Sequence, residues 1–403
     1  MSIKIKVIEP IDAHAWDEYV YNHPRATLYH LSGWQNVINK TYGHKTYYLM
    51  ATREPEGSQL SVKNYKLLAN SYELNSNHVV GILPLVHLKH LLFGNSLISI
   101  PFFDLGGILA NDENTEKALL SEVIKLGQEL KVENIELRHV EQLSWLANSS
   151  KLTANAKKDI PMNYDLSLPR ETRSMFHRGA MSCVTKSHKV RMLLDLPESS
   201  EVLMQSFKAK LRSQIKKPLK EGLKFKVGGV ELLDDFYKVF SINMRDLGSP
   251  VHSKSLMKNV LEEFPKESRI IMVYKDDQPI ACSLIVGFTD TLENPWASAL
   301  RQYSRLSPNM LLYWTMLEYA CDNGLKYFDF GRSSPDEGTY KFKEQWGAVP
   351  TPLHWHYIAL DGQPIGEETS EKSKFERAIQ YWQKLPVPVT KIIGPMIRKH
   401  IGL

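Results

Sequence analysis

Cysteine pairs, long apolar runs and a strong excess of one charge are all missing from this sequence. Its three cysteines, Cys183, Cys282 and Cys321, are far apart and show no C-x-x-C spacing, which argues against a disulfide framework or a zinc site and favours a reducing cytoplasmic location. The first residues contain no apolar core of signal-peptide length, and Asp104 interrupts the longest apolar stretch, 97–110. We therefore expect no membrane-spanning segment.

The sequence also lacks the motifs of several common enzyme classes. GxxxxGK[ST], GxGxxG after a strand, HExxH and GxSxG do not occur, which excludes the usual ATPase, dinucleotide-binding, zinc-protease and serine-hydrolase functions. A net charge of +5 over 403 residues is a weak argument for nucleic acid or anionic lipid as a partner. The hydrophobic content of 43% is typical of a globular protein, and the length allows two or three domains.

One order of predicted elements occurs twice along the chain. Residues 16–139 predict a helix pair, a hairpin with a polar insertion over 53–77, a strand, a helix and a strand, and residues 200–330 repeat this order. The repetition favours an α/β (α+β) fold with two domains of the same topology, related by internal duplication. The predicted units are an N-terminal domain over 1–165, to which strand 352–360 is added, a C-terminal domain over 186–350, and a helical tail over 366–403.

Some element boundaries are also predicted by local signals. A strand is expected near Leu97–Phe103, before a Gly-Gly turn. Pro218 predicts a kink or a stop in a basic helix, because proline removes a backbone donor there. Ser307 is the predicted cap of a helix with Pro308 in its first turn.

A polar loop after an aromatic strand is the best candidate for a functional site. The strand Tyr327–Phe330 ends at Gly331, and charged residues crowd the following segment up to Gly347. A rigid sheet can hold the charged side chains of such a loop over a cleft. The alternative is a solvated loop that its aromatic residues anchor.

A basic segment over 186–226 contains eleven Lys or Arg and four acids. On the predicted helix, Lys208, Arg212 and Lys216 recur at intervals of four and share a face, which Lys217 flanks. This face could bind the phosphates of a nucleotide-linked donor, an RNA or a lipid headgroup. A solvated helix face is the alternative.

Several motifs together resemble the FemAB-like family, and more narrowly its branch associated with exosortase (PEP-CTERM) and exopolysaccharide gene clusters. They are WDEYVYNHPRATLYHLSGW, VGILPLVHLK, LRSQIKKPLKEGL, NMRDLGSP, PNMLLYWTMLEYACDNG and FDFGRS…YKFKEQWG, and they cover about Trp16 to Tyr357. The resemblance implies two tandem N-acetyltransferase-like (GNAT) domains. It also implies a cytoplasmic transferase that passes an acyl or aminoacyl group to an amine acceptor in peptidoglycan-precursor, exopolysaccharide or other cell-envelope assembly.

The resemblance also implies roles for individual residues. Lys343 matches the lysine that assists at the reacting carbonyl, and Arg245 the arginine that binds precursor phosphates, whereas Ile38 stands where the family has a second phosphate-binding lysine four residues after Trp34. The expected substrate-binding set is Arg245, Arg212, Lys216, Lys217, Trp34 and Trp346. Arg332 could fix a carboxylate or phosphate, and Asp329 or Asp336 could orient the amine or take its proton. Turn formation or ion pairing is the alternative for both aspartates.

No cofactor is firmly implied, and the donor could be aminoacyl-tRNA or acyl-CoA. The segment RQYSRLSPNML contains no glycine where a CoA-binding turn would be expected, so a pyrophosphate would lack its backbone cradle. The expected acceptor is an anionic lipid- or nucleotide-linked precursor.

The apolar, basic C-terminus could rest on the inner face of the membrane or dock on the protein itself. An acyl-CoA N-acetyltransferase and a non-catalytic scaffold for exopolysaccharide assembly are the alternative functions, and the oligomeric state is open.

Overall fold

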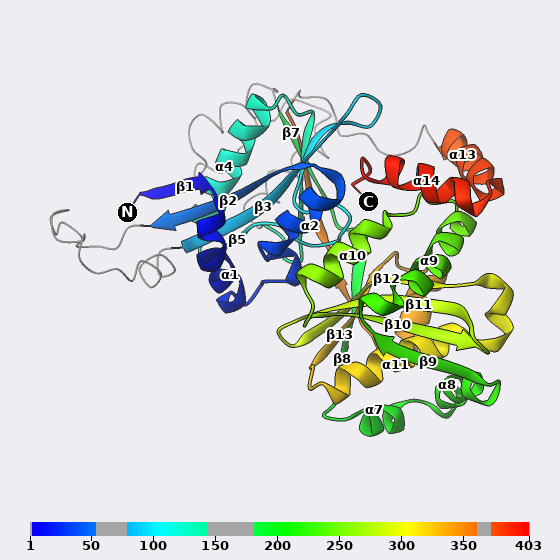
Figure 1. The fold of residues 1–403 in the computed structure, drawn as a ribbon. Coiled ribbons are helices and arrows are strands. Elements are labelled where there is room, and N and C mark those ends of the chain that lie inside the picture. The colour runs from blue at the N-terminus through cyan, green and yellow to red at the C-terminus, as the bar shows by residue number, and fades with distance from the viewer. Residues whose placement is uncertain (1, 54–78, 144–180, 361–371, 403) are drawn as a thin grey trace, which may run out of the picture.

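A computed structural model of the chain describes residues 2–53, 79–143, 181–360 and 372–402. Two mixed β-sheets, one mainly from the first half of the chain and one from the second, lie beside each other (Figure 1). The polar insertion predicted for the first hairpin falls almost wholly outside the described residues.

The first sheet has the strand order β1-β2-β3-β4-β6-β15-β7, and β5 pairs with β3. Its strands are β1 (Ile3–Val7), β2 (Lys45–Arg53), β3 (Val79–His90), β4 (Gly94–Ile98), β5 (Leu109–Ala110), β6 (Asn134–His139), β7 (Ser182–Lys186) and β15 (His354–Ala359). Helices α1 (Ala13–Asn22), α2 (Gly33–Tyr42) and α4 (Glu113–Glu129) pack on it. α4 begins where the Asp112 side chain accepts the N–H of Thr115, and it buries Leu119 and Val123.

The second sheet has the order β14-β8-β13-β12-β11-β10-β9. Its strands are β8 (Val190–Asp195), β9 (Leu223–Gly228), β10 (Ser268–Lys275), β11 (Gln278–Phe288), β12 (Thr291–Ala299), β13 (Tyr327–Ser333) and β14 (Val349–Pro352). Its helices are α7 (Ser200–Ser206), α8 (Ala209–Lys220), α9 (Leu233–Leu247), α10 (Lys254–Glu263), α11 (Pro308–Asp322) and α12 (Gly338–Glu344). The Ser199 side chain caps α7.

The two sheets have matching topologies. In the first, β4 and β6 are parallel on either side of the α4 connection, and in the second β12 and β13 are parallel on either side of α11. The position beside β6 is taken by β15, from the C-terminal part of the chain, and the equivalent position beside β13 by β8, the first strand of the second domain. The chain therefore crosses between the sheets twice, from β7 to β8 and from β14 to β15.

The structure corrects several local predictions. β4 ends at Ile98, because the positive φ angles of Ile100 and Phe102 turn the backbone away from the sheet. Ser307 has a φ of 57° and its side chain makes no capping hydrogen bond, so it is not the predicted side-chain cap. Pro218 lies in the last turn of α8 and the helix continues to Lys220. The edge strands β7 and β9 were not anticipated, since both read as polar segments.

A hydrophobic seam joins the two domains. α2 packs against α10, Trp34 contacts Phe264 with ring centroids 5.0 Å apart, and Phe103 contacts Trp296 at 5.4 Å. A Cβ on Gly33 would lie 3.0 Å from side-chain atoms of Glu263 and Phe264, so a larger residue there would force these side chains to shift. This packing fixes the domains relative to each other and hence the shape of the space between them.

The C-terminus forms two helices, α13 (Lys372–Lys384) and α14 (Val387–Arg398), which pack against α9 of the second domain. They are the orange and red helices beside α9 in Figure 1. Among the described residues, no helix is long and apolar enough to cross a membrane.

Candidate active site

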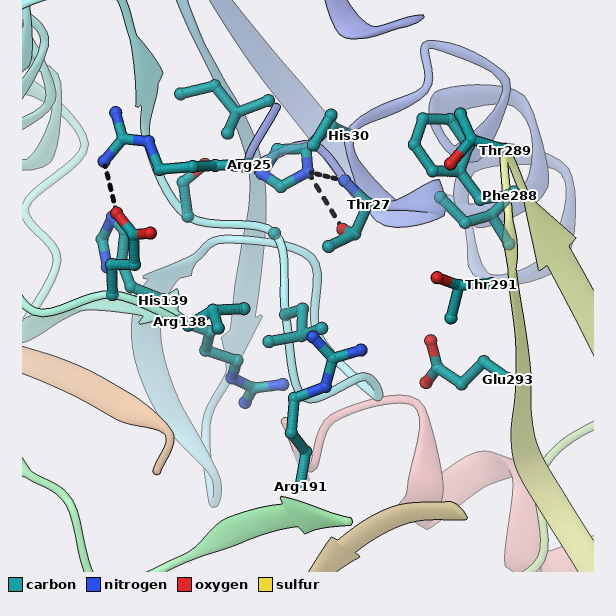
Figure 2. A pocket seen from close by; sticks show the side chains of 18 of the residues that line it. Arg25, Thr27, His30, Arg138, His139, Arg191, Phe288, Thr289, Thr291 and Glu293 are labelled. Carbon is teal, nitrogen blue, oxygen red and sulfur yellow. Dashed lines mark hydrogen bonds and ion pairs between the residues drawn. The ribbon is translucent and has the colours of Figure 1, made fainter. Parts of the chain in front are cut away.

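A cavity of about 390 Å³ lies between the two domains. The first domain lines it with the segments 24–30, 105–109 and 138–141, and the second with Arg191, Leu193 and residues of β11 to β13. Figure 2 shows charged side chains from both domains pointing into this space. The two halves of the chain must therefore pack together to form the cavity.

Two neutral histidines fix the first-domain wall of the cavity. Burial lowers the pKa of His30 to about 4, and its ring bonds the backbone N of Thr27 and the carbonyl oxygen of Gly107 at 3.1 Å each. Burial also holds the pKa of His139 well below its usual value, and its Nε2 accepts the N–H of Ile108 at 2.8 Å. Both rings hold loops in place and carry no charge near neutral pH.

Glu293 on β12 faces the cavity from the second domain (Figure 2). Its Oε1 accepts a hydrogen bond of 2.6 Å from the Tyr29 hydroxyl of the first domain. Burial, together with the negative charge of Asp329, raises the pKa of Glu293 to about 8, although the Tyr29 hydrogen bond and Arg191 oppose the shift. A carboxyl group with such a pKa can take up and release a proton near neutral pH.

Arg191 and Asp329 form an ion pair beside Glu293. The Nε and Nη2 of Arg191 lie 2.8 and 2.7 Å from Oδ2 of Asp329, and the other carboxylate oxygen accepts the N–H of Gly331 at 2.8 Å. Asp329 is 2% exposed, so its carboxylate is fully engaged inside the protein. Burial alone would lower the pKa of Arg191, but Asp329 and Glu293 raise it overall, so its guanidinium stays charged at the cavity wall.

Lys343 on α12 is 7% exposed. Its Nζ donates hydrogen bonds to the carbonyl oxygens of Gly331 at 3.0 Å and Arg332 at 2.8 Å. Gly331 has a φ of 75°, which favours glycine and turns these groups toward the lysine. Burial lowers the pKa of Lys343 to about 8, against the attraction of Asp329 and Asp104. Lys343 does not line the cavity wall, and the acids that attract its charge, Asp329 and Asp104, do not line it either.

Arg332 connects this group to the first domain. Its guanidinium carbon lies 5.0 Å from the ring centroid of Trp355, and that of Arg138 lies 4.8 Å from the same ring. The Nε of Arg332 lies 3.4 Å from Oδ1 of Asp104, a buried carboxyl group whose pKa burial raises. Because Arg332 is 29% exposed, it can also meet a ligand at this seam.

The structure brings together three of the four residues predicted as catalytic: Lys343, Arg332 and Asp329. Asp336 is exposed in the turn before α12, with a φ of 68°. This backbone conformation favours the turn-forming alternative for Asp336. For Asp329, the engaged carboxylate favours the ion-paired alternative over proton transfer.

The predicted substrate-binding residues do not gather at the cavity. Arg245 pairs with Asp246 and donates to the carbonyl of Leu385, so it faces the C-terminal helices. Arg212, Lys216 and Lys217 lie on α8, which packs on α11 and β9 at the edge of the second sheet farthest from β14. Neither these α8 cations nor Lys343 line the cavity. Trp34 and Trp346 are 0% and 1% exposed and belong to the hydrophobic core.

Four residues of the site were missed by sequence reasoning: Tyr29, Asp104, Arg191 and Glu293. Asp104 gave a usable signal, since an acid within the longest apolar stretch predicts a buried charge. Tyr29 lies within a motif that supported the family resemblance. The sequence around Glu293 and around Arg191 shows no signal of a site, because the role of each residue depends on contacts with partners far away in the chain.

Removing the Asp329 carboxylate should strongly destabilise the protein. The substitution Asp329→Ala leaves the Arg191 guanidinium buried without its partner, and breaking such a pair costs about 3–5 kcal/mol. Urea unfolding followed by circular dichroism measures this loss. The exposed Asp336→Asn is the control, because asparagine also tolerates the positive φ at this position, and it should change stability by less than about 0.5 kcal/mol. Equal effects of the two substitutions would contradict the role assigned to the pair.

Comparisons with known proteins agree with this architecture. Residues 205–344 match the family model of the acetyltransferase (GNAT) domain. No curated protein matches the chain significantly by sequence.

Among the solved structures that resemble most of the chain are two with related descriptions. A structure of FemX has a TM-score of 0.57 and 13% identity, covering 87% of this chain and 96% of the other. A tandem GNAT protein from the clavulanic acid biosynthesis pathway has a TM-score of 0.50 and 10% identity, covering 91% and 100%. At such identities the likeness shows the fold alone. The duplicated fold predicted from the repeated order of elements, and the GNAT-like domains that the resemblance implies, are thereby confirmed: this chain consists of two tandem GNAT-like domains.

Proposed function

We propose that the protein is an acyltransferase that passes an acyl group to an amine in the cavity between its two domains. The observation that carries this proposal is Glu293, a carboxyl group at the cavity wall whose pKa is raised to about 8. The match of residues 205–344 to the GNAT domain family supports the same class of reaction.

The reaction requires a neutral amine, whereas an alkylamine is mostly protonated near neutral pH. The Glu293 carboxylate takes the proton, and the Tyr29 hydroxyl holds the carboxylate in place. The amine nitrogen then forms a bond to the acyl carbon, and the carbonyl oxygen becomes negative. Collapse of this intermediate breaks the bond to the leaving group, which carries away the bonding electron pair and receives the second proton of the attacking nitrogen, so that a neutral amide remains.

Positive charge near the intermediate lowers the barrier to this step. Arg191 presents its guanidinium at the cavity wall. The Lys343 ammonium, which the carbonyl oxygens of Gly331 and Arg332 hold, does not line this wall and acts through its positive charge. No further partner of this ammonium occurs in the described part of the chain. Arg332 is the group that binds a carboxylate or phosphate of the donor or acceptor.

The identity of the acyl donor is a more specific part of the proposal. α11 begins at Pro308, which has no backbone N–H, after a 3₁₀ turn over Arg301–Leu306 that contains no glycine. These features argue against the usual cradle for the pyrophosphate of CoA and favour an aminoacyl ester such as aminoacyl-tRNA. The match to the acetyltransferase (GNAT) domain family keeps acyl-CoA as the second candidate. The cell-envelope role, with a peptidoglycan or exopolysaccharide precursor as acceptor, rests on the sequence resemblance, and the likeness to FemX supports only the fold it implies.

A transfer assay with two donors tests the function. The full chain is incubated with a precursor amine and either radiolabelled aminoacyl-tRNA or radiolabelled acetyl-CoA, and label in the acceptor is counted. We expect label from aminoacyl-tRNA. In parallel, a donor present at a hundred times its Kd should stabilise the folded protein by about 2.7 kcal/mol, seen as a higher Tm. Absence of both transfer and stabilisation with either donor would reject the enzyme and favour the scaffold.

A further inference from the structure

The last helix of the chain carries apolar side chains on its outer face. Ile392 and Met396 of α14, four residues apart and therefore on one face, are 69% and 62% exposed, and Ile393 is 38% exposed. Tyr381 on α13 is 72% exposed. The opposite side of α14 buries Thr390 and Gly394, and Gly394 lies against Val251 of the second domain. α14 is therefore docked on the protein through one face and displays an apolar second face.

A second apolar element lies at the end of this helix. The turn between β3 and β4 exposes Leu91, Leu92 and Phe93 by 97%, 81% and 45%. His400, just after α14, stacks against this turn, with ring centroids 4.1 Å from His90 and 6.0 Å from Phe93. The turn of the first domain and the helix after the second domain thus adjoin, although about 300 residues separate them in the sequence.

The C-terminal segment itself carries charge of one sign. From Arg377 to the C-terminus the chain contains five Lys or Arg and no Asp or Glu. Lys384 is exposed just before α14, and Lys89 is exposed next to the β3–β4 turn. Lys391 is also exposed, with its ammonium 5.4 Å from the ring centroid of Tyr237 on α9. Arg398 is different, because it turns inward and donates to Nε2 of His252 at 3.0 Å. An apolar patch surrounded by lysines, with no acid on this segment, is complementary to an anionic surface that has an apolar interior.

We propose that the outer face of α14 and the β3–β4 turn form a surface that binds an anionic lipid bilayer. The twelve-residue helix is too short to span a membrane, and its basic, one-sided apolar character suits a helix lying in the headgroup region. Leu91 and Leu92 insert beside it, and the lysines contact phosphate groups. Binding requires no acyl donor or acceptor, so this inference stands apart from the proposed reaction.

Vesicle co-sedimentation of the full chain tests the surface. We expect the protein to bind vesicles of phosphatidylcholine and phosphatidylglycerol, to bind phosphatidylcholine alone much more weakly, and to be released by high salt. Ile392→Glu and Leu92→Glu should each lower the partition coefficient by about tenfold or more, because each replaces an inserting apolar side chain with a charge of the wrong sign.

Ile11→Glu is the matched control, since Ile11 is 72% exposed and lies before α1, outside this surface. It should bind vesicles as the wild type does. The proposal is overturned if the protein does not bind the anionic vesicles, or if Ile11→Glu and Ile392→Glu bind equally. Sedimentation velocity without lipid gives a further check: a dimer that Ile392→Glu dissociates would assign the surface to a second copy of the chain and would also overturn the proposal.

Discussion

The substitution Glu293→Gln is expected to lower the rate of acyl transfer by about a hundredfold to ten-thousandfold, the usual contribution of a general base. Glutamine keeps the size of the side chain and can still accept the hydrogen bond from Tyr29, but it cannot take a proton from the amine. In the wild type, kcat/KM should rise with pH up to about 8, where Glu293 loses its proton. The variant should lack this dependence.

The same substitution should change how stability depends on pH. The folded-state pKa of Glu293 is raised to about 8 from its ordinary value of 4.5, so between these pH values the folded protein holds a proton that the unfolded chain has released. Stability contributed by this group is therefore complete below pH 4.5 and is lost as the pH rises to about 8. Glutamine removes that loss, so Glu293→Gln should unfold at a higher temperature than the wild type above pH 8.

Asp290→Asn is the control for both measurements. Asp290 lines the same cavity, but its side chain is 41% exposed and lies 3.7 Å from Lys326. We expect this variant to keep most of its activity and the pH dependence of the wild type. If it were as inactive as Glu293→Gln, the effect would come from the overall charge of the cavity and the proton would not be assigned to Glu293.

Lys343→Met should also reduce transfer by about a hundredfold or more, as expected when one group that stabilises the negative intermediate is lost. Methionine occupies a similar volume without the ammonium group. Because burial lowers the pKa of Lys343 to about 8, the positive charge disappears as the pH rises above that value. Together with Glu293, this gives a narrow bell-shaped pH–rate profile centred near pH 8, and Lys343→Arg should keep its activity at higher pH.

Lys341→Met provides the comparison within the same helix. Lys341 is exposed on α12, two residues from the buried Lys343, so its removal should leave the rate nearly unchanged. Circular dichroism and Tm show whether each variant is folded. A folded Lys343→Met protein with the activity of the wild type would remove Lys343 from the mechanism.

The duplicated fold could be predicted from the sequence because its main signals are local. Apolar periodicity and turn residues define α4, α11 and the β10–β11 hairpin within short windows. The polar edge strands β7 and β9 have no such pattern, since pairing with a neighbouring strand defines them. At Ser307 a local signal was present but misleading. Serine is a common helix cap, yet the side chain of Ser307 makes no capping hydrogen bond.

The candidate site was only partly accessible from the sequence. The turn after β13 stood out because charges gather there, and the structure indeed places Asp329, Arg332 and Lys343 close together. The cavity itself depends on contacts such as Tyr29 with Glu293, 264 positions apart. The α8 cations were misleading because charge density does not reveal which side of a domain a helix occupies.

The crossing of the chain between the two sheets has a consequence for biosynthesis. Strand β15, which covers β6 in the first sheet, is made only after the whole second domain has been translated. Until then, the nascent N-terminal half has an open sheet edge on the ribosome and is a target for chaperones or for pairing with the wrong strand. A truncation at the end of the second domain removes β15 and would therefore impair the first domain as well. The two domains consequently depend on a single continuous chain for their folding.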